Sequence, residues 1–164
     1  MKRGASRIVS VMAEKFPRSP YDALHGLVYF PRMLDKIRLH AAGDLPEVYH
    51  ENLGTGFDER CLNLLQVKYE AVRERVLAGE SDEQVFEWCR AHGRPLTEED
   101  IEIWSGFMQK RGWRDEASER VAFRLKEAGL EHRDKEAATM FDFIDFDEGR
   151  TPPDFTKWQP PRLG

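Results

Sequence analysis

Four charged side chains follow Pro31 within two helical turns, and their types are those that bind anions or move protons. They are Arg32, Asp35, Lys36 and Arg38. Lysine and arginine donate hydrogen bonds to carboxylates and phosphates, and a guanidinium donates two parallel bonds. A carboxylate among cations stays ionised, because the cations favour its charged form. We therefore predict that Arg32, Lys36 and Arg38 bind an anionic ligand. Asp35 is the predicted catalytic residue of this group.

Histidine and tyrosine residues flank the same segment and extend the predicted site. His25 and Tyr29 precede it, and His40 follows it. A histidine close to a carboxylate is a usual arrangement for proton transfer near neutral pH. We predict His25 and Tyr29 as further catalytic residues, and His40 as a further ligand-binding residue. The scattered positions indicate no Ser-His-Asp or Cys-His arrangement.

Two other interpretations of these charges stay open. The first is a solvated helix face, on which pairs at i,i+3 and i,i+4 each contribute about 0.2–0.5 kcal/mol. The second is internal pairing, because residues 1–40 hold eight Lys or Arg and three Asp or Glu, and the rest of the chain carries the acidic excess. The acidic segment 142–148 would then fold back onto this basic N-terminal quarter. In that case Arg32, Lys36 and Arg38 would be structural.

The sequence around these residues, and most of the rest of the chain, is predicted to be helical. Apolar residues recur at spacings of three and four through most of the chain, and capping residues precede several of these stretches. The pattern predicts an all-α fold, with a single compact domain of about six to seven helices at residues 18–150. Residues 1–17 are expected to be an N-terminal extension, and residues 151–164 an extended proline-rich tail.

The expected helices begin at capping residues or at proline, and most end at glycine. A short one runs from Pro20 to about His25, and the Pro31 helix ends at Gly43. The others lie at about 58–78 (as one helix, or as two with a break near 66–68), 82–92, 98–111, 121–128 and 134–145. The alternation Leu27-Val28-Tyr29-Phe30 is too short to predict a sheet.

Composition limits the classes of function. The net charge of −5 argues against a general nucleic-acid binder, and no stretch approaches the roughly 18 apolar residues of a membrane span. Cys61 and Cys89 have no CxxC spacing, so we expect reduced thiols and a cytoplasmic protein. Histidines and acidic residues show no metal-ligand spacing, so no metal is predicted. No nucleotide-binding glycine motif occurs, and the sequence identifies no cofactor.

Several short motifs stand out together. They are Gly26-Leu27-Val28, the segment Pro31–Arg38, Phe57-Asp58 with Cys61-Leu62, and Glu87-Trp88. Through them, residues 18–115 resemble a family of small bacterial proteins known only as a domain of unknown function. Asp147-Glu148-Gly149-Arg150 resembles the ending of longer members. The family has no established activity, so the resemblance implies no catalytic residue. It does imply that the Pro-Arg-x-x-Asp-Lys-x-Arg motif is a family hallmark, which favours a functional role for its charges.

Two functions of different classes follow. The first is an uncharacterised helical protein that binds, and in one version converts, a small anionic metabolite in a pocket beside the Pro31 helix. The alternative is a non-catalytic protein-interaction module, whose contact surfaces are the basic N-terminal quarter and the aromatic tail with Phe155 and Trp158. Whether the protein is an enzyme stays open. Nucleic acid and membranes are not expected partners, and a dimer is compatible with the sequence.

Overall fold

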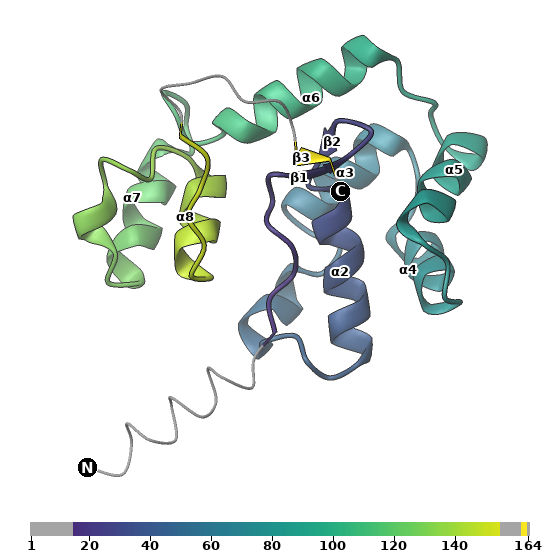
Figure 1. Cartoon of the computed structure of the whole chain (residues 1–164), viewed down its shortest axis with the longest axis horizontal. Coiled ribbons are helices and arrows are strands. Elements are labelled where there is room, and N and C mark those ends of the chain that lie inside the picture. The colour runs from purple at the N-terminus through teal and green to yellow at the C-terminus, as the bar shows by residue number, and fades with distance from the viewer. Residues whose placement is uncertain (1–14, 155–161, 164) are drawn as a thin grey trace. The chain divides into compact units, whose positions relative to one another are not determined.

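The computed structural model describes residues 15–154 and 162–163, and α-helices account for most of its regular structure (Figure 1). The helices are α2 (Phe30–Ala41), α3 (Phe57–Leu65), α4 (Tyr69–Leu77), α5 (Asp82–His92), α6 (Glu98–Lys110), α7 (Ser118–Glu127) and α8 (Met140–Asp147). Short 3-10 helices lie at Glu47–Asn52 and Glu131–Arg133, and the strands are β1 (Asp22–Leu24), β2 (Leu27–Val28) and β3 (Arg162–Leu163). Among the described residues, no helix has both the length and the apolar character that a membrane span requires.

The chain divides into two compact units, and each is built from two separate stretches of sequence. The first unit comprises Met1–Arg18 and Arg32–Pro95, and the second comprises Ser19–Pro31 and Leu96–Gly164. The first unit therefore holds α2 from Arg32 onward together with α3, α4 and α5. The second holds the three strands and α6, α7 and α8. The helical domain that we expected at residues 18–150 stays a prediction.

In the first unit, the first two turns of α2 are buried on most sides, and exposure increases toward its end. Met33, Leu34 and Ile37 are at most 2% exposed, at the spacing of three and four that the sequence predicted. Of the two alternatives left open for residues 58–78, the structure has two helices: α3 ends at Leu65, and its cap Gln66 has a φ of 54°, in the left-handed region. A capping box between Ser81 and Gln84 begins α5, the helix that the sequence predicted at 82–92.

The end of α5 depends on Gly93. The backbone N–H of the next residue, Arg94, donates to the carbonyl oxygen of Leu65 over 2.8 Å. A Cβ on Gly93 would lie 2.1 Å from that same oxygen, which is closer than any real contact. A glycine is therefore required where the end of α5 meets the end of α3.

The second unit begins with a β-hairpin in place of the short helix that we expected from Pro20 to His25. β1 and β2 are antiparallel, with Leu24 opposite Leu27. His25 and Gly26 form the two-residue loop, and both have positive φ, at 50° and 82°. Such a loop matches the twist of a hairpin. β3 adds to β1 in parallel, so the sheet order is β2-β1-β3.

Two side chains of α6 hold this hairpin. Trp104 Nε1 donates to the carbonyl oxygen of Val28 over 3.1 Å, and the Ser105 hydroxyl donates to that of Gly26 over 2.7 Å. Beyond α6, a small apolar core joins α7 and α8. Its buried members are Val121, Leu125 and Ala137, with Leu130, Met140, Phe143 and Phe146 packed against them.

The structure corrects the predicted fold class in part. The fold is mostly helical, as predicted, but Leu27 and Val28, in the alternation that we considered too short for a sheet, form β2 and pair with β1. The last helix begins at Met140, after its Thr139 cap, and not at residue 134. Of the predicted extended tail, residues 151–154 form no helix or strand, and 162–163 form β3. The tail aromatics Phe155 and Trp158 lie outside the described residues, as does most of the N-terminal extension.

Candidate functional site

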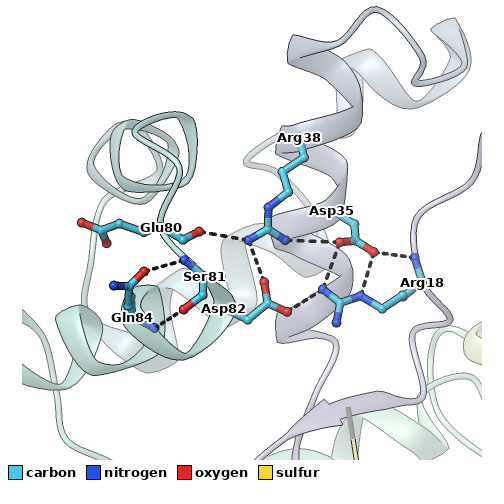
Figure 2. A network of polar contacts seen from close by, with 7 residues as sticks. All are labelled: Arg18, Asp35, Arg38, Glu80, Ser81, Asp82 and Gln84. Carbon is cyan, nitrogen blue, oxygen red and sulfur yellow. Dashed lines mark hydrogen bonds and ion pairs between the residues drawn. The ribbon is translucent and has the colours of Figure 1, made fainter.

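Four charged residues of the first unit form a closed cycle of ion pairs, shown in Figure 2. Arg18 Nε lies 2.8 Å from Asp35 Oδ2, and Asp35 Oδ1 lies 3.4 Å from Arg38 Nη1. Arg38 Nη2 lies 2.7 Å from Asp82 Oδ1, and Asp82 Oδ2 lies 2.6 Å from Arg18 Nη2. Each arginine thus contacts both aspartates. We call Arg18, Asp35, Arg38 and Asp82 the four-residue network.

Local structure places each member of the network. Asp35 and Arg38 lie one turn apart on α2, and Asp82 is the first residue of α5. Asp82 follows Ser81, whose side chain accepts a hydrogen bond from Gln84 N, so the start of α5 is fixed by its cap. Negative charge is favoured in the first turn of a helix. Arg38 also donates to the carbonyl oxygen of Glu80 over 3.4 Å.

The network is partly open to solvent. The side chains of Arg18 and Arg38 are each 35% exposed, and those of Asp35 and Asp82 are 21% and 19% exposed. The hydrogen bond to Asp35, against the opposing effect of burial, raises the pKa of Arg18 above its usual value. Charge-assisted bonds at these lengths are stronger than neutral ones, and solvent exposure reduces their contribution.

Lys36 forms a separate and fully buried ion pair. Its Nζ lies 2.9 Å from Asp58 Oδ1, and the two side chains are 4% and 0% exposed. The ammonium also donates to the carbonyl oxygen of Asn52, and Asp58 Oδ2 accepts from Gly54 N over 3.0 Å. These bonds satisfy charges that would be costly to bury alone. The pair fastens α2 to α3 and to the loop before it.

Arg32 is also buried, at 3% exposed. Its Nη1 donates to the carbonyl oxygen of Arg18 over 3.0 Å, and its guanidinium lies 5.9 Å from the centre of the Tyr49 ring. Arg32 therefore holds the backbone of a residue whose side chain belongs to the four-residue network.

Comparison with protein families gave one match, over residues 14–150, to the model described as a domain of unknown function (DUF5069). The chain belongs to this family. A comparison with curated proteins found no match. Membership fits an uncharacterised, mostly helical protein. The bacterial origin and the status of the Pro31–Arg38 motif as a DUF5069 hallmark stay predictions.

The predicted site residues of this DUF5069 protein fall into both units. Arg32, Asp35, Lys36, Arg38 and His40 lie in the first, where all belong to α2. The His40 ring lies edge-on to the ring of His50, with centres 4.7 Å apart. The three predicted cations contact groups of the protein itself: Arg32 a carbonyl oxygen, Lys36 and Arg38 carboxylates. Their role in ligand binding stays a prediction, as does the catalytic role of Asp35.

His25 and Tyr29, the other predicted catalytic residues, lie in the second unit. His25 is exposed in the hairpin loop. Tyr29 is 3% exposed, has a φ of 73°, and stacks against Phe141 with ring centres 6.1 Å apart. Their pairing with Asp35 in a common site stays a prediction.

Sequence reasoning missed Arg18, Asp58 and Asp82 as members of the charged arrangement. Asp58 belonged to a motif that carried the family resemblance, and Asp82 was the first residue of a predicted helix. Nothing in the sequence connects Arg18 with Asp82, because tertiary packing alone brings them together. The residues of one helix face therefore do not indicate partners such as Arg18 and Asp82.

The acidic segment at the end of the second unit is largely buried. Asp142 accepts from the Tyr21 hydroxyl over 2.7 Å, and Asp145 accepts from the Ser19 hydroxyl over 3.0 Å. Both carboxylates are 0% exposed. Burial raises the pKa of Asp142 to about 6, although hydrogen bonds from Tyr21, Ala138 and Thr139 act in the opposite direction. These acids therefore hold the residues before β1 against α8.

Proposed function

We propose that this protein binds a small anion, a carboxylate or a phosphate, through the guanidinium groups of Arg18 and Arg38. One observation carries the proposal. The carboxylate of Asp82 is held between these two arginines, with a separate guanidinium nitrogen at 2.6 Å and 2.7 Å from its two oxygens. This is the arrangement with which proteins recognise carboxylate and phosphate ligands. Asp82 occupies the position that the ligand takes.

Exchange of Asp82 for a ligand is physically reasonable. One carboxylate replaces another on the same donors, so the exchange loses little hydrogen-bond energy. Asp82 stays at the first turn of α5 after release, where the helix dipole favours its charge. Asp35 keeps both arginines in place, because it contacts each of them. With the Asp82 side chain turned away, the two guanidinium groups have hydrogen-bond donors free for a negative ligand.

The proposal assigns different roles to the charges of the Pro31 helix. Arg38 contacts the ligand, and Asp35 positions the arginines. Arg32 holds the backbone of Arg18, and Lys36 anchors α2 through Asp58. The proposal concerns binding alone and includes no chemical conversion.

The test removes the internal competitor. In Asp82→Ala the two guanidiniums lose their resident carboxylate, so inorganic phosphate should bind this variant more tightly than the wild-type chain. The measurement is thermal unfolding against phosphate concentration, with sodium chloride at matched ionic strength as the reference. A larger phosphate-dependent rise in Tm for Asp82→Ala is expected. Asp82→Asn serves as a second variant that keeps the shape of the side chain.

A matched control lies on the same helix. Glu87→Ala also removes one carboxylate from an arginine, Arg90, in a pair whose two side chains are about half exposed. Glu87→Ala should respond to phosphate like the wild type. Adding Arg38→Ala to Asp82→Ala should abolish the additional phosphate-dependent rise in Tm. Equal phosphate responses in Asp82→Ala, Glu87→Ala and wild type would overturn the proposal and leave the network with a structural role.

A further inference from the structure

Helix α6 in the second unit has apolar residues on two neighbouring faces, about 100° apart around its axis. Trp104 and Met108 are at most 8% exposed and belong to the interior, as the hairpin contacts of α6 require. Ile103 and Phe107, on the other face, are 65% and 43% exposed. They lie one turn apart, so their exposed area is continuous along the helix. The guanidinium of Arg111 lies 5.7 Å from the centre of the Phe107 ring, next to this exposed pair.

Charges of opposite sign lie at the two ends of this exposed face. Glu99 lies one turn before Ile103, and Lys110 lies about one turn after Phe107, and both charged residues are exposed. The stripe Glu99–Ile103–Phe107–Lys110 therefore begins acidic, is apolar in its middle and ends basic. We call these four residues the α6 stripe.

We infer that the α6 stripe is the contact surface of an antiparallel dimer of this chain. When two copies of α6 lie antiparallel about a two-fold axis near the middle of the stripe, Glu99 of each copy faces Lys110 of the other. Ile103 of each copy then packs near Phe107 of the other. The stripe is thus complementary to itself under the symmetry that most protein dimers have. A second copy of the chain matches both its charge order and its apolar centre.

Gly106 fits this arrangement. It lies between Ile103 and Phe107 in the sequence of the helix, and a Cβ placed on it would meet nothing within 4 Å. Glycine inside a helix is unfavourable relative to alanine, and an alanine would have room at this position within one copy of the chain. Its missing side chain permits close approach of a second helix along the stripe. One helix face is smaller than a standard interface, so the dimer is expected to be concentration-dependent.

Charge reversal tests the inference in the full chain by sedimentation velocity over a concentration series. The wild type should show a monomer–dimer equilibrium. Glu99→Lys alone and Lys110→Glu alone should each weaken the dimer by roughly tenfold, because each places two like-charge pairs in the interface. An equimolar mixture of the two variants should restore the dimer, because the mixed pair has two opposite-charge contacts.

The neighbouring Glu98 supplies a matched control. Like Glu99 it is exposed and lies in the first turn of α6, but it lies off the stripe. Glu98→Lys should therefore dimerise like the wild type. It changes the net charge as much as Glu99→Lys does, so it tests whether net charge alone weakens the dimer. Phe107→Asp should give monomer at all concentrations. A wild type that stays monomeric throughout the series, or a mixture of Glu99→Lys and Lys110→Glu that stays monomeric, would overturn the inference.

Discussion

Arg38 Nη2 lies 2.7 Å from Asp82 Oδ1, and this contact joins α2 to the first residue of α5. The other oxygen of the same carboxylate lies 2.6 Å from Arg18 Nη2. Loss of either arginine therefore leaves two aspartates with one cation, whereas loss of Asp82 leaves two arginines with one aspartate. The two kinds of substitution should have opposite effects on the affinity for anions, although both remove ion pairs.

Removal of Arg38 should lower stability modestly. Arg38→Met keeps much of the aliphatic stem but removes the bonds to Asp35, Asp82 and the carbonyl oxygen of Glu80. Because the side chains are partly exposed, we expect a loss of about 1 kcal/mol in the free energy of unfolding, measured by urea denaturation. Arg90→Met, in an exposed pair with Glu87, should cost less than about 0.5 kcal/mol. Equal losses for the two variants would contradict the role of the network in joining α2 to α5.

The buried pair of Lys36 and Asp58 should be far more sensitive. Lys36→Met leaves the carboxylate of Asp58 buried without its cation, and we expect a loss of about 3–5 kcal/mol in the free energy of unfolding. The double variant Lys36→Met with Asp58→Asn should recover a large part of the lost free energy of unfolding, because the asparagine is neutral and still accepts from Gly54 N. Guanidinium denaturation of the single and double variants measures this difference. A double variant no more stable than Lys36→Met would argue against an uncompensated charge as the cause.

Asp142 should make stability depend on pH in the direction opposite to most carboxylates. Its pKa is raised to about 6 in the folded state, above the value of about 3.9 for an unfolded chain. Its favourable contribution to the free energy of unfolding is therefore complete below about pH 4 and is lost as pH rises through 6. Relative to Asp142→Asn, the wild type should lose up to about 3 kcal/mol between pH 4 and 7. A stability difference that stays constant over this range would contradict the raised pKa.

Tyr21→Phe supplies an independent check on the same carboxylate. The variant removes the hydroxyl that donates to Asp142 over 2.7 Å and that favours its ionised form. The pKa of Asp142 should therefore rise further in this variant. Nuclear magnetic resonance titration of the carboxyl carbon follows that pKa directly. A pKa that falls or does not change would show that the Tyr21 bond does not stabilise the carboxylate.

The helices could be predicted from the sequence because their signals are local. Ser81 with Gln84, and Thr97 with Asp100, form capping boxes in which all partners lie within four residues. The hairpin could not be predicted in this way. Ser19 resembles a helix cap in sequence, but its hydroxyl donates to Asp145 at the far end of the chain. Long-range hydrogen bonding therefore overrides a local preference at that point.

The candidate site likewise combines contacts that are local in sequence with contacts between distant residues. Periodicity placed Asp35 and Arg38 on a common stretch of α2, and they do lie 3.4 Å apart. Their other partners, Arg18 and Asp82, come from distant parts of the sequence, so no spacing rule relates them. The burial of Lys36 also depends on Asp58 of α3, since only a tertiary partner makes an interior ammonium tolerable.

The central claim is that Arg18 and Arg38 bind an anion in the place of Asp82. Isothermal titration calorimetry with inorganic phosphate tests it most directly on three chains: wild type, Asp82→Ala, and Asp82→Ala with Arg38→Ala. We predict the tightest binding for Asp82→Ala, at least roughly tenfold tighter than for the wild type, and no measurable binding for the double variant. Phosphate binding that is equal in Asp82→Ala and the double variant would contradict the claim.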